Sequence, residues 1–172
     1  GADSCIKLKI KPNFVIGDLD SIKNKALIKF KNIIKKVDDQ NSTDLQKAIK
    51  LAKNLKPNKI TIIGAIGNRI DHTIANILIL NNLNIPTKII DKSNIIEVIT
   101  KNKVINGKIG DIISIIAITD VKKLTYSGLK FNLNNKDVKP GWLGTSNELS
   151  EKKATISFKK GKLILIRTIG EK

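Results

Sequence analysis

The sequence predicts an α/β chain whose first half is built on parallel strands and whose second half is all β. Residues 14–91 alternate short apolar runs with helical patterns, as do strands joined by helical crossovers. After about Ile105 the helical period disappears, and short strand-like runs follow one another. Hydrophobic residues make up 41% of the chain but aromatic residues only 3%, so isoleucine, leucine and valine must fill a strand-rich core.

Three short apolar strands are expected in the first half, at residues 14–16, 33–37 and 59–63. Between the last two, apolar residues recur at spacings of three and four over residues 45–55, which predicts an amphipathic helix. Thr43 and Gln46 have the spacing of a capping box at its start, and Pro57 ends it. A second helix is expected from about residue 71 to residue 83.

The strands expected in the second half are residues 112–118, 122–126, 154–158 and 163–166. Lys160-Gly161 predicts a hairpin turn between the last two, and Asn106-Gly107 is compatible with another. The chain length suits one substantial domain or two small ones, and the boundary is expected between Asp91 and Gly107.

The formal net charge is +17, which is typical of proteins that bind nucleic acid or membrane surfaces. However, the lysines are scattered along the chain, there is no arginine-rich run, and few aromatic residues could stack on bases. A solvated, compositionally biased surface that attracts polyanions such as ATP is the favoured interpretation. A nucleic-acid-binding module is the rival, and it predicts tight, salt-sensitive binding to nucleic acid.

A single cysteine, Cys5, excludes an intrachain disulfide and a zinc site built from thiolates alone. With only one histidine, His72, a zinc centre or a histidine-activated nucleophile has very little support. No apolar run reaches the roughly 18 residues that span a bilayer, and no signal segment is recognisable at the start. We therefore expect a cytoplasmic protein with no membrane partner.

The first motif with chemical potential is residues 17–21, GDLDS, directly after an expected strand. Ligands bind at the carboxyl ends of parallel strands, and two carboxylates one residue apart, Asp18 and Asp20, can hold Mg²⁺ together. The alternative is that one aspartate caps the following helix while the other is solvated.

A second acidic position, Asp44, opens the expected helix after Thr43. A helix amino end favours phosphate, so a carboxylate there needs a metal ion or a basic group beside it. Ordinary helix capping is the alternative interpretation.

The third motif is residues 64–72, GAIGNRIDH, between a strand and a helix. Gly64 and Gly67 let the backbone turn tightly, so that its amides can point at phosphate oxygens. Arg69 offers a planar donor for phosphate, and Asp71 can orient that arginine or help to hold a metal ion. His72 is expected to be a hydrogen-bonded residue at the helix start rather than an acid-base catalyst.

The last cluster lies in the β half and contains Trp142, Ser146 and Asn147. A tryptophan beside small polar residues can stack on a flat heteroaromatic ligand while the polar groups fix its orientation. A core tryptophan is the alternative.

These motifs follow one another in a fixed order: Pro12 and residues 17–21, 42–44, 64–72, 127–130 and 146–148. In that order they resemble the thiamine pyrophosphokinase family, and the resemblance covers nearly the whole chain. It implies a Rossmann-like parallel-sheet domain that binds ATP and Mg²⁺ at residues 1–100, and a small all-β sandwich domain that binds thiamine at residues 101–172. It also implies a homodimer with thiamine sites between subunits, and no specific nucleic-acid partner.

The implied activity is a transferase reaction, in which the thiamine hydroxyl attacks the β-phosphorus of ATP and AMP leaves. The resemblance assigns the catalytic residues Asp18, Asp20, Asp44 and Asp71, of which the first three would also hold Mg²⁺. It assigns ATP and phosphate binding to Ser21, Thr43, Gly64, Gly67, Arg69 and His72. It assigns thiamine binding to Trp142, Ser146 and Asn147. A regulator, or a transferase acting on another hydroxyl-bearing acceptor, is a further interpretation.

Two positions depart from the family pattern. Asn41 stands where the family often has an aspartate two residues before the Thr-Asp pair, which removes one negative charge from the expected metal site. The family also begins with a strand that leads into an Asp-Gly-Gly-Ala-like loop, of which Gly1-Ala2-Asp3 is the expected remainder. Loss of that strand is expected to lower stability or turnover.

Overall fold

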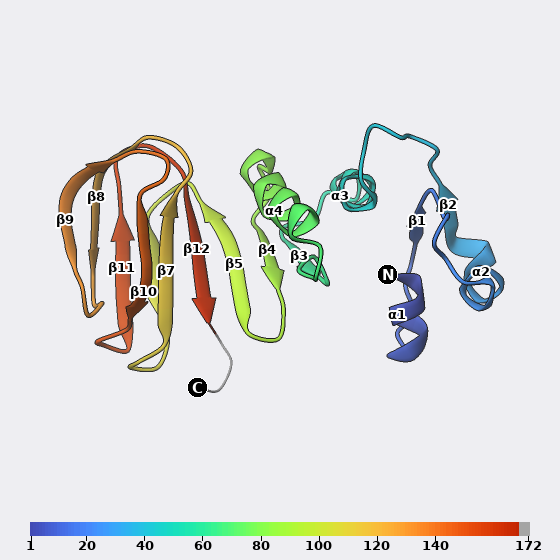
Figure 1. Ribbon diagram of the computed structural model, residues 1–172, viewed down its shortest axis with the longest axis horizontal. Coiled ribbons are helices and arrows are strands. Elements are labelled where there is room, and N and C mark those ends of the chain that lie inside the picture. The colour runs from blue at the N-terminus through green and yellow to red at the C-terminus, as the bar shows by residue number, and fades with distance from the viewer. Residues whose placement is uncertain (169–172) are drawn as a thin grey trace. The chain divides into compact units, whose positions relative to one another are not determined.

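The computed structural model describes residues 1–168, and the chain divides into two compact units, Gly1–Asn58 and Lys59–Lys172 (Figure 1). The first unit combines helices with a small sheet, and the second carries most of the strands. This agrees with the predicted mixed α/β first part and β-rich second part. In the second unit, β5 before residue 100 and β12 after it pair in one sheet. The predicted domain boundary between residues 100 and 101 stays a prediction.

The first unit has three helices, a 3₁₀ turn and two strands: α1 (Ala2–Lys7), β1 (Val15–Gly17), α2 (Asn24–Phe30), η1 (Lys31–Ile33), β2 (Ile34–Lys36) and α3 (Asp44–Asn54). β1 and β2 pair in parallel, with Val15 opposite Ile34 and Gly17 opposite Lys36. α3 packs beside β1, so the start of this helix lies near the carboxyl end of the strand.

The start of α3 is fixed by the predicted capping box. The Thr43 hydroxyl accepts from the Gln46 backbone N–H at 3.3 Å, and the Gln46 side chain accepts from the Thr43 N–H at 2.8 Å. Two backbone donors that a helix otherwise leaves unpaired are thereby satisfied. The cap therefore defines where Asp44, the first residue of the helix, stands.

The second unit begins with β3 (Ile60–Ile63), α4 (Ile70–Ile79), η2 (Leu80–Asn82) and β4 (Thr87–Ile90). Eight further strands follow: β5 (Asn94–Ile99), β6 (Lys103–Asn106), β7 (Ile112–Ala117), β8 (Val121–Ser127), β9 (Leu133–Val138), β10 (Leu143–Glu148), β11 (Lys153–Ser157) and β12 (Leu163–Thr168). Together with β3 and β4, these strands form a six-stranded sheet in the order β10-β7-β12-β5-β4-β3 and a four-stranded sheet in the order β6-β11-β8-β9 (Figure 1). β3 and β4 are parallel, and the other pairs are antiparallel.

One apolar core joins the two sheets of the second unit. β7 alternates buried and partly buried residues, with Ile113, Ile115 and Ala117 pointing into the core. Leu165 of β12 and Ile156 of β11, which belong to opposite sheets, are both in the same buried cluster. The sheets therefore form a sandwich whose core is aliphatic, as the composition predicts.

Both predicted hairpins are wrong. Lys160-Gly161 connects β11 to β12, but β11 pairs with β6 and β8 while β12 pairs with β5 and β7. Asn106-Gly107 likewise leads from β6 in one sheet toward β7 in the other. The turns were predicted from local sequence, whereas the burial of two apolar faces against each other sends consecutive strands into opposite sheets.

Five strands were not predicted from the sequence, β4, β5, β6, β9 and β10, and the last three of these lie at the edges of their sheets. β9 reads LNNKDV and β10 reads LGTSNE, so neither shows an apolar alternation. An edge strand needs few buried side chains, and polar residues on it discourage pairing with other chains. α4 ends at Ile79, earlier than predicted, although the 3₁₀ turn η2 continues to Asn82.

The helices of the described chain are all too short or too polar to cross a membrane. α4 leaves a row of apolar side chains exposed, Ile70, Ile74 and Leu78, spaced four residues apart on one helix face.

Alanine at Gly128 is expected to destabilise the sandwich far more than alanine at Gly141. Both glycines have a positive φ, 77° and 90°, at which a side chain costs about 1–2 kcal/mol. A Cβ at Gly128 would also overlap the Lys153 carbonyl oxygen and lie 2.9 Å from the Ala154 Cα, whereas a Cβ at Gly141 meets nothing within 4 Å. This overlap adds about 1–3 kcal/mol. Chemical denaturation measures the free energies of unfolding, and equal losses would contradict the prediction.

Candidate active site

Two predicted carboxylates converge at the carboxyl end of β1. Asp18 follows the strand directly, and Asp44 opens α3. A Cβ placed on Gly17 would lie 2.8 Å from Asp44 Oδ1, so the Asp44 carboxylate rests against the last residue of the strand. A side chain at position 17 would therefore displace the Asp44 carboxylate, and glycine leaves that carboxylate in place.

A lysine that the sequence analysis missed, Lys47, faces both carboxylates. Its Nζ lies 3.7 Å from Asp18 Oδ2 and 3.7 Å from Asp44 Oδ1. Lys47 is only 4% exposed, whereas the side chains of Asp18 and Asp44 are 31% and 61% exposed. The available signal was its position three residues after Asp44 in α3, which places the two side chains on one helix face.

Asp20 and Ser21 point into solvent beyond this pair. The backbone N–H of Asp20 donates to Asp18 Oδ1 at 3.2 Å, and both Asp20 and Ser21 are exposed. Leu19, between the two aspartates, has a φ of 71°. A bulky residue in this region is strained, and such strain is found where the surrounding structure must aim side chains.

Asp18 and Asp44 suit a hard divalent cation. Mg²⁺ usually takes one or two carboxylates from a protein and completes its shell with water and phosphate oxygens, and this pair supplies that number. Among residues 1–168, no group of three or more histidine, cysteine, aspartate or glutamate side chains is close enough to hold a metal ion. The pair fits the cation, and Asp20 stays a prediction as a third ligand.

The loop before α3 contains a carboxylate that the sequence analysis did not single out, Asp39. It accepts from the Ser42 hydroxyl at 2.6 Å and from the Asn41 N–H at 2.9 Å. These bonds, the Ser42 hydroxyl first, hold the pKa of Asp39 below its usual value. A negative charge is therefore present in this loop although Asn41 itself is neutral.

The predicted phosphate loop in the second unit is pinned to α4 by two further side chains. The Thr73 hydroxyl accepts from the Gly67 N–H and donates to the Gly67 carbonyl, both at 3.3 Å. The Asn76 amide donates to the Ala65 carbonyl at 2.8 Å. A Cβ at Gly64 or Gly67 would meet nothing within 4 Å, so the outer side of the loop is open to a ligand.

Arg69 and Asp71 form a two-point ion pair at the start of α4. Arg69 Nε donates to Asp71 Oδ1 at 3.2 Å, and the terminal Nη2 donates to Oδ2 at 2.6 Å. The arginine bond, followed by the backbone N–H of His72, lowers the pKa of Asp71 to about 2. Asp71 thus orients the guanidinium, which is one of the two roles predicted for it, and His72 is exposed beside it.

Trp142 packs at the edge of the sandwich core. It is partly buried against the apolar cluster, and its ring centroid lies 6.5 Å from that of Tyr126 with the planes tilted by 44°. This is the arrangement expected of a core tryptophan, but partial exposure leaves part of the ring accessible. Its contact with a ligand stays a prediction.

Ser146 and Asn147 lie at an irregular point of β10. The pairing register with β7 shifts between Gly144 and Asn147, and Ser146 is exposed with a φ of 57°. Such bulges re-aim side chains and are common beside functional sites. Asn147 is buried, and its amide accepts from the Phe131 N–H at 3.0 Å and donates to the Phe131 carbonyl at 2.7 Å. Asn147 therefore holds the Phe131 segment, and Ser146 is the freer of the two.

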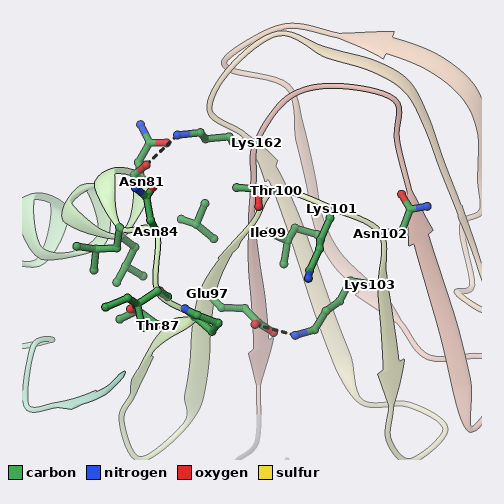
Figure 2. A pocket seen from close by; sticks show the side chains of 15 residues that line it. Asn81, Asn84, Thr87, Glu97, Ile99, Thr100, Lys101, Asn102, Lys103 and Lys162 are labelled. Atoms are coloured by element: carbon green, nitrogen blue, oxygen red, sulfur yellow. Dashed lines mark hydrogen bonds and ion pairs between the residues drawn. The ribbon is translucent and has the colours of Figure 1, made fainter. Parts of the chain in front are cut away.

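The second unit also has a cavity of about 530 Å³ that the sequence analysis did not anticipate. Figure 2 shows it between the segment after α4 and the β5–β6 turn, with Glu97 paired to Lys103 at 2.8 Å. On the opposite wall, Lys162 donates to the Asn81 carbonyl at 2.9 Å. None of the predicted site residues lines this cavity.

Two family models match the chain over almost its whole length. The model described as "Thiamin pyrophosphokinase, catalytic domain" matches residues 1–90. The model described as "Thiamin pyrophosphokinase, vitamin B1 binding domain" matches residues 93–163.

Individual relatives agree with these models. The chain is 32% identical to the thiamine pyrophosphokinase of Bacillus subtilis over 98% of this chain and 84% of the relative. It is 31% identical to thiamine pyrophosphokinase 1 of Arabidopsis thaliana over 88% of this chain and 63% of the relative.

Solved structures show the same fold. The thiamine pyrophosphokinase structure from Bacillus subtilis superposes with a TM-score of 0.89 at 31% identity, covering 99% of this chain and 85% of the other. The thiamin pyrophosphokinase structure from Candida albicans superposes with a TM-score of 0.82 at 18% identity, covering 98% and 79%. The second likeness concerns the fold alone.

The Asp71 carboxyl is expected to titrate near pH 2, because Arg69 stabilises its charged form. A lowered pKa means that the carboxylate stays ionised, and the pair stays formed, as the pH falls to about that value. In an Arg69→Gln variant the pKa should rise toward the ordinary value of 3.8. Carbon-detected NMR titration of the Asp71 carboxyl group measures both midpoints. An unchanged Asp71 midpoint in the variant would contradict the assignment.

Proposed function

The chain belongs to the thiamin pyrophosphokinase family, which makes thiamine diphosphate from thiamine and ATP, and we propose that Asp18 and Asp44 form the cation site of that reaction. The observation that carries this proposal is the convergence of the two carboxylates where β1 ends and α3 begins. In α/β proteins this end of the strands is where ligands bind.

Asp18 and Asp44 would hold Mg²⁺ there, and the cation would supply positive charge that neutralises the phosphates during transfer. The side chains of the protein would bind and orient ATP and thiamine. Asp20 is proposed as a further ligand, supported by its exposed position two residues after Asp18. Ser21 and Thr43 are proposed to contact ATP, and the Thr43 hydroxyl already serves as the cap of α3.

The phosphates are proposed to meet the Gly64–Gly67 loop and Arg69. Open space at both glycines, a loop pinned by Thr73 and Asn76, and a guanidinium oriented by Asp71 support this role. Prearranged donors stabilise transferring phosphoryl groups with little reorganisation. His72, exposed beside Asp71, is proposed to assist phosphate binding and not proton transfer.

The transfer itself breaks the bond between the β-phosphorus of ATP and the oxygen that bridges to the α-phosphorus. The thiamine hydroxyl oxygen forms the new bond to the β-phosphorus, AMP leaves with the bridging oxygen, and the hydroxyl proton is lost. An aspartate of the carboxylate group is proposed to accept that proton, since a carboxylate within hydrogen-bond reach can act as general base. Positioning and charge neutralisation supply most of the acceleration in such a reaction.

Thiamine is proposed to bind at the β10 bulge, beside Trp142, Ser146 and Asn147. The strained backbone of Ser146 and the partly exposed indole of Trp142 support this location. Asn147 would act chiefly by fixing the Phe131 segment. Phe131 and Leu143 are exposed large apolar residues nearby in this part of the fold, which suits a surface that a second subunit covers in a homodimer.

Three finer features complete the proposal. A Rossmann-like parallel-sheet fold is proposed for the N-terminal part, supported by the parallel pairing within β1–β2 and within β3–β4 and by the structural likeness to family members. A cytoplasmic location is proposed, since the single cysteine Cys5 suits a reducing compartment. No specific nucleic-acid partner is proposed, because few aromatic side chains are available to stack on bases.

AMP release from ATP and Mg²⁺ is expected to require thiamine. The rate should fall at least about 100-fold in an Asp44→Asn variant, because a cation ligand is lost while the side chain keeps its shape. The matched control is Asp137→Asn on β9, which removes the same charge from an exposed pair with Lys122 of β8. Chromatographic separation of AMP, ADP and thiamine diphosphate measures the reaction. Thiamine-independent AMP, or equal rates in the two variants, would contradict the proposed function.

The Michaelis constant for thiamine is expected to rise about 3- to 10-fold in a Trp142→Ala variant, because a stacked ring pair contributes about 0.5–1.5 kcal/mol. The constant for ATP should not change. Trp142→Phe keeps a ring at this position and should behave more like the parent chain. Steady-state kinetics with each substrate varied in turn measures this, and equal changes in both constants would indicate a general loss of packing.

A further inference from the structure

We propose that Lys47 is a positioning residue that competes with the divalent cation for Asp18 and Asp44, so that the site rejects a bare cation and accepts one that arrives with phosphate. This inference rests on the proposed function, since it concerns the same carboxylates. The geometry that supports it lies within the first unit and involves only these three side chains.

The Lys47 ammonium is buried, and its burial has an energetic cost. Its side chain is only 3% exposed, and a buried charge is tolerated only when it is paired. In the part of the chain that the structure describes, its ion-pair partners are the two carboxylates at 3.7 Å. Lys47 therefore lies against both carboxylates that would hold the cation.

The contacts of Lys47 with Asp18 and Asp44 are long for charged hydrogen bonds. A strong charged hydrogen bond between an ammonium and a carboxylate is about 2.7–2.9 Å long, whereas both contacts of Lys47 are 3.7 Å. The ammonium is shared between two acceptors and bonded tightly to neither. Both carboxylates also keep a solvent-exposed side, at 31% and 61%, from which a cation can reach them.

Lys47 also changes the net charge of the cation site. The two carboxylates and Lys47 together carry one net negative charge, which attracts a divalent cation weakly. Lys47 makes the site one unit more positive before and after the cation binds, whether or not Asp20 also contributes a ligand. That extra positive charge disfavours a bare cation and favours one that carries an anionic companion such as the phosphates of ATP.

Lys47→Met should therefore change two affinities in opposite directions. The affinity for Mn²⁺ alone should rise at least about tenfold, because the competing charge is gone. The affinity for Mn²⁺ bound to a non-hydrolysable ATP analogue should fall about tenfold, because the phosphates lose a nearby positive charge. A residue that only stabilised the fold would weaken both when removed.

Electron paramagnetic resonance of free Mn²⁺ measures the first affinity, and competition with a fluorescent ATP analogue measures the second. The full chain is used throughout. Lys53→Met is the matched control, because it removes an equal charge from an exposed position of the same helix and should leave both affinities unchanged. Circular dichroism verifies that each variant is folded.

Lys47→Gln is the second variant, and it serves where methionine perturbs the packing. Its amide is neutral but can still donate to one carboxylate. Adding Asp44→Asn to Lys47→Met should abolish the gain in Mn²⁺ affinity, because one of the two carboxylates that contact Lys47 is lost. An unchanged or weaker affinity for Mn²⁺ alone in the folded single variants would overturn the inference. The proposed function is judged separately, by thiamine-dependent AMP release from the unaltered chain.

Discussion

The candidate site in the first unit depends on the burial of one charge. An ammonium removed from water must be paired, so the Lys47 side chain requires Asp18 and Asp44 to lie on either side of it. Asp18 belongs to the end of β1 and Asp44 to the start of α3, so this requirement ties strand and helix at the point where ligands bind. Gly17 completes the arrangement, because any larger residue would meet the Asp44 carboxylate. The same contacts that stabilise the unit therefore assemble its chemical groups.

The second unit depends on a different constraint, the burial of two apolar sheet faces against each other. Ile113, Ile115 and Leu165 are almost completely buried in that interface, and most consecutive strands from β5 to β12 lie in opposite sheets. β10, at an edge, is free to carry a bulge that a central strand would not tolerate without losing pairing on both sides. A rigid core with an irregular edge gives the proposed thiamine residues a stable support and an accessible surface.

Part of the candidate site was predictable because its signals are local. The capping box of Thr43 and Gln46 and the two-residue spacing of Arg69 and Asp71 involve neighbours in sequence, and the structure shows both contacts. Lys47, Thr73 and Asn76 were missed, because a lysine, a threonine and an asparagine on helices have many ordinary roles. Their significance comes from partners on other segments, such as Asp18, 29 positions before Lys47 in the sequence.

Amino-acid order was enough to predict the mixed α/β and β-rich parts, most of the central strands, and the family to which the motifs point. Apolar periodicity and turn residues act over a few positions, so these features can be recognised without a fold. Strand pairing is set by the three-dimensional fold, since Lys160-Gly161 and Asn106-Gly107 have the residues of hairpin turns but join different sheets. The fold also buries Lys47. Pairing and burial depend on long-range packing of whole faces, which no local pattern encodes.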